Sequence, residues 1–167
     1  MNIQEFISNY HNHPVLFIGT GMSLRYLENS YSWNSLLQKI ASDFNPDPEY
    51  YLDLKAEHMQ STGYAYEQIA AQIEKDFNQC LKENRHGKFE YINDLFYENI
   101  RNGTNISRFK LYLADLLKEV IIKDSALPEI AELKKARKNI SSVITTNYDQ
   151  MIEQLFSFNP LIGNDIL

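Results

Sequence analysis

The sequence predicts an α/β protein whose parallel sheet is interrupted by a large helical insertion. Residues 15–18 form a short apolar run and residues 142–146 a short β-branched segment; both are followed by polar or glycine residues, which is typical of parallel strands. Between them, from about 49 to 139, apolar residues recur at helical spacing. The chain has 167 residues, 44% of them hydrophobic and 13% aromatic, which is enough to build the core of one domain.

The first predicted strand, residues 15–18, has four apolar residues in a row, which predicts burial on both faces of a sheet. The Gly-Thr-Gly-Met-Ser segment after it resembles a phosphate-binding loop. Gly19 permits a tight turn, Gly21 lets a ligand approach the backbone, and Ser23 can cap a helix or donate to a phosphate oxygen. Arg25 either faces a pyrophosphate or lies solvated on the surface. A strand that ends in a tight turn is the simpler alternative, because the third glycine of the full dinucleotide fingerprint is missing.

The segments that follow favour helices. Ser32 is the expected N-cap of a helix whose apolar face includes Trp33, so we expect Trp33 in the core. Residues 45–48, Asn-Pro-Asp-Pro, break the chain before the helical run. The strongest apolar stripe extends over residues 109–121, and Pro128 suits the first turn of another short helix. A short helix is also expected over residues 2–10.

Composition excludes several classes of partner. A net charge of −6 argues against direct binding of nucleic acid, although backbone amides can still hold a dinucleotide. The N-terminus lacks the pattern of a signal peptide, and no apolar run reaches membrane-spanning length, so we expect a cytoplasmic protein with no membrane contact. Cys80 is the single cysteine and cannot form an intrachain disulfide, so we expect it to be a small buried apolar residue of a helix. His11 and His13 lack further ligands at a suitable spacing, so no metal is expected.

Polar residues also follow the second predicted strand. Thr146, Asn147 and Asp149 come at its carboxyl end, the edge of an open parallel sheet where ligands bind. In the alternative interpretation, Asn147 caps the next helix, with Gln150 completing a capping box and Asp149 complementing the helix dipole.

Three motifs together resemble the sirtuin-type NAD-binding domain, and most of all the sirtuin-like branch of bacterial antiphage defence proteins. The motifs are Ile-Gly-Thr-Gly-Met-Ser at 18–23, Trp-Asn-Ser-Leu-Leu at 33–37 and Thr-Thr-Asn-Tyr-Asp at 145–149. The likeness covers about residues 14–156, with specific identity confined to the motifs. It implies a Rossmann-like parallel sheet that is incomplete in this chain, so residues 1–167 would be the N-terminal part of one such domain, with the helical insertion at about 49–139.

The resemblance implies an enzyme that hydrolyses NAD to nicotinamide and ADP-ribose and so depletes NAD in infected cells, a form of abortive infection. It assigns catalysis to Asn147 and Asp149 and requires no metal. It further implies a homo-oligomer, with a phage protein as trigger or a partner defence subunit. The residues that would bind NAD as substrate are Gly19, Thr20, Gly21, Met22, Ser23, Arg25, Thr146 and Asn147.

The sequence departs from the family in two places. Thr20 stands where the family has alanine, and its bulk would narrow the loop. The family's catalytic histidine follows the asparagine motif, whereas all four histidines here precede it, so we expect residues 1–167 alone to be inactive even if the parent protein is an enzyme. Two alternatives stay open. One is an NAD-dependent protein deacylase, which a single cysteine disfavours because many deacylases carry a four-cysteine zinc site. The other is a module that senses NAD or ADP-ribose without turnover.

Overall fold

The computed structural model describes residues 5, 14–58 and 65–161. Over this part of the chain the protein is mixed α/β and mostly helical, with a two-stranded parallel sheet. The chain forms two compact units, a strand unit (Met1–Ser30 and Leu117–Leu167) and a helical unit (Tyr31–Leu116). No described helix is long and apolar enough to cross a membrane.

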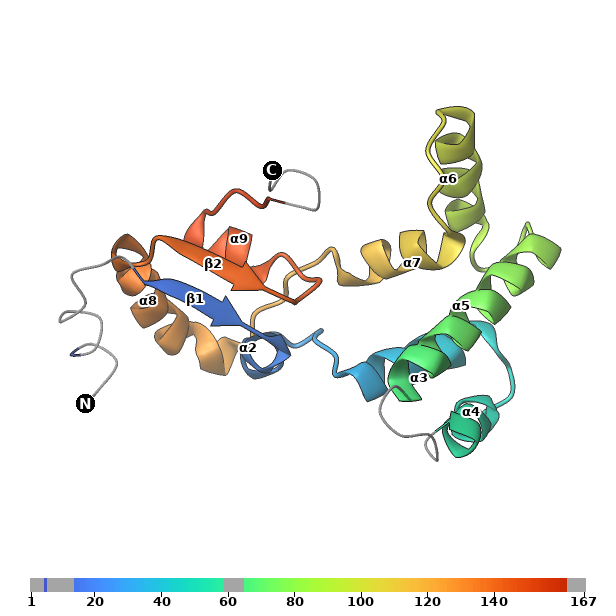
Figure 1. Ribbon diagram of the computed structural model, residues 1–167, viewed down its shortest axis with the longest axis horizontal. Coiled ribbons are helices and arrows are strands. Elements are labelled where there is room, and N and C mark those ends of the chain that lie inside the picture. Colours follow the sequence, from blue (N-terminus) through green and yellow to red (C-terminus); the bar gives the residue numbers. More distant parts are fainter. Residues whose placement is uncertain (1–4, 6–13, 59–64, 162–167) are drawn as a thin grey trace. The chain divides into compact units, whose positions relative to one another are not determined.

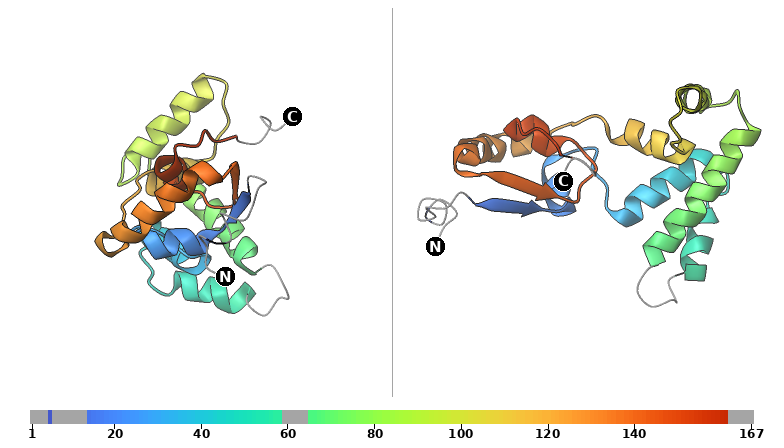
Figure 2. Two further views of the ribbon diagram at one scale, coloured as in Figure 1. Left: turned by 90° about the vertical axis from the view of Figure 1, so that its left-hand side faces the viewer. Right: turned by 45° about the horizontal axis from the view of Figure 1, so that its top comes forward.

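The sheet of the strand unit consists of β1 (Val15–Ile18) and β2 (Ser142–Thr145), which lie side by side and run in the same direction (Figures 1 and 2). The register pairs Val15 with Ser142 and Ile18 with Thr145. Both predicted strands are therefore confirmed, and β2 ends one residue before the expected Thr146. The parallel register brings the polar segments after the two strands to the same edge of the sheet.

One face of this sheet carries the core of the strand unit. Leu16, Ile18 and Val143 pack there against α2 (Thr20–Tyr26), α8 (Leu127–Ala136) and α9 (Met151–Phe156), together with residues of the 3-10 turn η1 (Asp124–Ala126). A second 3-10 turn, η2 (Arg137–Asn139), leads from α8 into β2. The buried members of this core are Ile18, Tyr26, Leu27, Ala126, Ile130, Met151, Ile152, Leu155 and Phe156.

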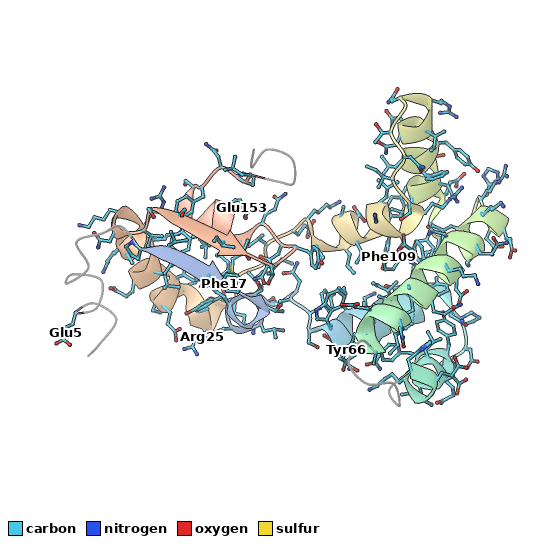
Figure 3. The ribbon with its side chains drawn as sticks, in the orientation of Figure 1. Glu5, Phe17, Arg25, Tyr66, Phe109 and Glu153 are labelled. Atoms are coloured by element: carbon cyan, nitrogen blue, oxygen red, sulfur yellow. The ribbon has the colours of Figure 1, made fainter. Side chains whose placement is uncertain are left out.

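The opposite face of the sheet is uncovered in the described part of the chain. Val15 is 54% exposed, Phe17 73% and Ile144 56%. The prediction that residues 15–18 are buried on both faces is therefore wrong. The reason is that the helices of the strand unit pack against the alternate residues Leu16 and Ile18, which point to the other side of the strand. Phe17 is labelled on β1 in Figure 3.

The helical unit contains five helices in its described residues. They are α3 (Trp33–Phe44), α4 (Tyr50–His58), α5 (Ala65–Glu83), α6 (Glu90–Arg101) and α7 (Arg108–Leu117, whose last residue belongs to the strand unit). The fully buried ring of Phe77 in α5 lies 5.1–6.0 Å from four aromatic rings, which makes an aromatic cluster the centre of this unit. Its partners are Phe44, Phe89, Phe109 and Tyr112. The helical run expected over about 49–139 is therefore shared between the two units, because α4 to α7 lie almost entirely in the helical unit and α8 lies in the strand unit.

A buried arginine links two helices of the helical unit. Arg108 is 8% exposed, and its Nε donates to Asn93 Oδ1 at 2.6 Å. Its guanidinium lies 3.8 Å from the ring centroid of Phe96. The charge is therefore satisfied by an amide oxygen and an aromatic face.

Several local expectations are confirmed. Ser32 caps α3, since its hydroxyl accepts from the Ser35 N–H in a capping box, and Pro128 lies in the first turn of α8. Cys80 differs from the expectation of a buried residue, because it is only half-buried, with its thiol 3.9 Å from the carbonyl oxygen of Phe44. Apart from Glu5, the helix expected at 2–10 lies outside the described residues, as does the pair His11 and His13.

Two local expectations are wrong. Trp33 is 48% exposed, because it is the first residue of α3 and the buried face of that helix is formed by Leu36, Leu37, Ile40 and Ala41. The stripe over 109–121 also ends early. After Leu117 the backbone leaves the helix. The Ile121 carbonyl accepts from the Glu28 N–H at 2.8 Å, and the Lys123 N–H donates to the carbonyl of Tyr26, the last residue of α2, at 2.9 Å.

Candidate polar site at the carboxyl edge of the sheet

Three polar side chains meet where β1 and β2 end. Ser23 comes from α2, while Asn147 and Asp149 lie between β2 and α9. The Asn147 Nδ2 lies 2.7 Å from Ser23 Oγ and 3.2 Å from the Gly19 carbonyl oxygen. Ser23 Oγ lies 2.7 Å from Asp149 Oδ2. Two segments more than a hundred residues apart thus form one hydrogen-bonded network, here called the Ser-Asn-Asp network.

The direction of each hydrogen bond in this network follows from chemistry. The Gly19 carbonyl can only accept, so the Asn147 atom facing it must be the Nδ2 donor. Ser23 Oγ then accepts from the same amide group and uses its own proton to donate to the Asp149 carboxylate. The amide of Asn147 is therefore held in one orientation.

This orientation leaves the oxygen of the same amide, Oδ1, without a hydrogen-bond donor. Asn147 Oδ1 is buried and accepts no hydrogen bond; among the described side chains, the only other such atom is Glu153 Oε2. A buried acceptor without a partner costs about 1–3 kcal/mol. A hydroxyl, an N–H group or a water molecule that donates to Oδ1 would recover this free energy, so the network presents a preoriented acceptor.

Short-range contacts build the segment that carries Asn147. The Thr145 hydroxyl accepts from the Asn147 N–H at 3.0 Å, and Asp149 Oδ1 accepts from the Met151 N–H at the same distance. Because α9 begins only at Met151, with Gln150 at its N-cap, the interpretation of Asn147 as a helix cap is wrong. The side chain that receives the first helical N–H belongs to Asp149, which leaves Asn147 free to contact the first strand's loop.

The glycine loop lies against this segment and has open space beside it. Gly19 is the N-cap of α2, and its carbonyl also accepts from the Met22 N–H at 3.1 Å. A Cβ placed on Gly19 or Gly21 would meet no atom of the described residues within 4 Å. Packing among these residues therefore does not require glycine at position 21, whereas a close approach by a ligand would require it. Thr20 is the first residue of α2, and Ser23 lies inside that helix rather than capping it.

The remaining candidate residues lie apart from the Ser-Asn-Asp network. The Met22 side chain packs against the core of the strand unit. Thr146 is exposed, and its backbone N–H donates to the Ile18 carbonyl at 3.4 Å. Arg25, labelled in Figure 3, forms a two-pronged ion pair with Glu129 of α8, with both N–O distances at 2.9 Å. The hydrogen bonds and charge of Glu129 raise the pKa of Arg25 above its ordinary value. Because this pair is exposed, it contributes little to stability and can exchange for another anion.

Sequence reasoning missed two residues that shape the site. Thr145 could have been found, because a hydroxyl two residues before a loop asparagine commonly accepts its N–H. Glu129 gave no signal, since it lies 104 positions from Arg25.

Comparison with protein family models, with curated proteins and with solved structures finds no match to this chain. Among the described residues, no three His, Cys, Asp or Glu side chains gather as they would around a metal ion. The two described histidines, His58 and His86, belong to the helical unit, where His86 Nδ1 contacts Glu90 Oε1 at 2.8 Å.

Proposed function

We propose that the Ser-Asn-Asp network is the nicotinamide-ribose end of an NAD site, and that the protein hydrolyses NAD to nicotinamide and ADP-ribose. The observation that carries the proposal is the buried acceptor Asn147 Oδ1, which lacks a partner and is held by two hydrogen bonds from Nδ2. A ribose hydroxyl or the attacking water is the kind of donor that it requires. The open space beside Gly19 and Gly21 supports the approach of the rest of the dinucleotide.

The proposed chemistry is cleavage of the bond between the nicotinamide nitrogen and the ribose. The bond's electron pair leaves with nicotinamide, the ribose carbon becomes oxocarbenium-like, and water adds to it with release of one proton. Groups of negative partial or full charge stabilise such a centre when they are fixed in place beforehand. The carbonyl oxygen of Asn147 and the carboxylate of Asp149 are groups of this kind, and hydrogen bonds to Ser23, Gly19 and Met151 hold them in place.

The three-motif resemblance supports the wider part of the proposal. In it, β1 and β2 belong to a Rossmann-like sheet, and NAD cleavage serves antiphage defence in a homo-oligomer that a phage protein or a partner subunit activates. Each part is open to experiment separately from NAD binding itself.

The test measures binding and turnover independently. NAD binding to the chain is measured by calorimetry, and nicotinamide release is followed with the full-length protein. Asn147→Ala should abolish most of the release while the melting temperature falls only modestly. Asn159→Ala is the matched control, because Asn159 is an exposed asparagine of the same unit. Equal activity of the wild-type protein and Asn147→Ala would contradict the proposal.

A second candidate is a module that binds NAD or ADP-ribose without turnover. The observation that favours it is the set of groups in the network, which are a hydroxyl, an amide and a carboxylate. No described histidine belongs to the network, so it contains no imidazole that could act as a general base. Tight NAD binding without nicotinamide release by the full-length protein would select this candidate.

A further inference from the structure

We infer that Ser23 is a positioning residue, whose hydroxyl orients Asn147 and Asp149 and does not contact the phosphates of the ligand. The inference rests on the proposed NAD site and differs from the role that the glycine-loop resemblance implies for Ser23. In this arrangement the backbone around Gly19 and Gly21 binds the phosphates of NAD, and the Ser-Asn-Asp network binds its nicotinamide ribose.

The first argument is that the hydroxyl of Ser23 is already engaged. Ser23 is 2% exposed, its single proton is directed to Asp149 Oδ2 at 2.7 Å, and its oxygen accepts from Asn147 Nδ2 at 2.7 Å. To donate to a phosphate, the hydroxyl would have to break its hydrogen bond to the Asp149 carboxylate and turn its proton toward the phosphate. That carboxylate would lose its donor just as a second anion came close, which is unfavourable.

The second argument concerns the orientation of the Asn147 amide. Only two acceptors hold Nδ2 in the described structure, and the one at Ser23 is the closer, 2.7 Å against 3.2 Å for the Gly19 carbonyl. Without the Ser23 hydroxyl, only the longer hydrogen bond remains. The amide can then rotate about its last side-chain torsion, which is broad and roughly two-fold, and Oδ1 loses its fixed direction.

The first arm of the test needs no ligand. The side-chain amide signals of Asn147 are recorded by NMR in the wild-type chain and in Ser23→Ala, with Ser142→Ala as control because Ser142 is exposed on β2. In Ser23→Ala we expect these signals to shift and their protons to exchange faster with water, with no such change in the control. Unchanged Asn147 signals in Ser23→Ala would overturn the inference.

Asp149→Asn approaches the same network from its other end. The Ser23 hydroxyl donates to Asp149 Oδ2 and the Met151 N–H donates to Oδ1, and in asparagine one of these two atoms becomes an NH2 group, which cannot accept, so one of the two donors loses its acceptor. This variant should also disturb the Asn147 signals, and it keeps the test decisive if Ser23→Ala folds poorly. Asp124→Asn, an exposed position in η1, is its control.

The second arm separates positioning from phosphate binding. ADP carries the pyrophosphate but lacks the nicotinamide ribose, so a positioning role predicts unchanged ADP affinity in Ser23→Ala. The kcat for nicotinamide release should fall by roughly 10²-fold, as expected for a misplaced catalytic group. A parallel loss of ADP and NAD affinity with unchanged kcat would overturn the inference. If the wild-type protein binds neither ligand, the proposed function fails, and the NMR arm alone decides whether Ser23 orients Asn147.

Discussion

Ser23 and Asn147 stand 124 positions apart in the sequence, yet the amide of Asn147 donates to the hydroxyl of Ser23 at 2.7 Å. The contact joins α2, the helix that follows β1, to the loop after β2, and it exists because the two strands are parallel and adjacent. It also directs the opposite atom of the amide, Oδ1, into a buried position without a partner. The same pair therefore contributes to the fold and presents the acceptor on which the proposed function depends.

Asn147→Asp tests whether the amide is needed as a donor. A helix cap would tolerate this change, whereas here a carboxylate would face the Gly19 carbonyl and lie close to Asp149. We expect destabilisation by roughly 1–3 kcal/mol, because acceptors would then face acceptors, together with a large loss of nicotinamide release. Chemical denaturation and the release assay measure the two effects. Neutral behaviour in both, equal to that of Asn159→Asp, would mean that neither the fold nor the release of nicotinamide needs the amide donor of Asn147.

Gly21 offers a way to separate ligand approach from folding. A Cβ there meets no atom within 4 Å in the part of the chain that the structure describes, and the residue is helical, so Gly21→Ala should leave the fold intact and stabilise it by about 0.4–1 kcal/mol. Gly21→Val adds bulk where the proposed pyrophosphate approaches, and NAD affinity should fall in calorimetry. Gly87→Ala is the control, since its Cβ makes only an ordinary contact at 3.8 Å in the helical unit. Wild-type NAD affinity in folded Gly21→Val would contradict the loop assignment.

The two faces of β1 should respond differently to substitution. Phe17→Thr removes a ring that is 73% exposed, and we expect a change in unfolding free energy within about 0.5 kcal/mol. Ile18→Ala removes a side chain that is 8% exposed and packed in the core of the strand unit, with an expected cost of about 2–5 kcal/mol. Urea denaturation of both variants gives the comparison. A large cost for Phe17→Thr would mean that this face is covered in solution.

Asp43 should make the acid stability of the helical unit depend on pH. Burial alone would raise its pKa, but hydrogen bonds from Lys39, Tyr112 and Lys88 outweigh burial and hold the pKa below its ordinary value. Because the folded pKa is the lower one, the stabilisation is fully present above the unfolded pKa of about 3.9 and is lost as the pH falls through the folded pKa.

Asp43→Asn should therefore destabilise the protein at pH 7 by roughly 1–3 kcal/mol, and the difference from wild type should shrink below about pH 4. Asp94→Asn, an exposed position in α6, should follow the wild-type profile. Thermal unfolding from pH 2 to 7 tests this, and a difference independent of pH would rule out the charge of Asp43 as its source.

Local patterns in the sequence were sufficient for the secondary structure near the site. The apolar run at 15–18 and the β-branched segment at 142–146 predicted β1 and β2, and Ser32 and Pro128 marked the starts of α3 and α8 correctly. These signals depend on residues within a few positions of each other, where backbone geometry and capping are decided. The same patterns placed Asn147 and Ser23 at strand ends, which made them candidates before any contact was known.

The tertiary structure alone decided which of these side chains meet and which faces are covered. Phe17 and Trp33 are large apolar residues of the kind found in protein cores, but both are exposed. Phe17 is exposed because the helices pack against the other face of β1, and Trp33 because it is the first residue of α3 and lies off its buried face. The pairing of Asn147 with Ser23 and the capture of Arg25 by Glu129 depend on segments about a hundred residues apart. Spacing along the chain determines which residues share a face of one element, whereas the partner of that face is set by packing between elements, and no local pattern records it.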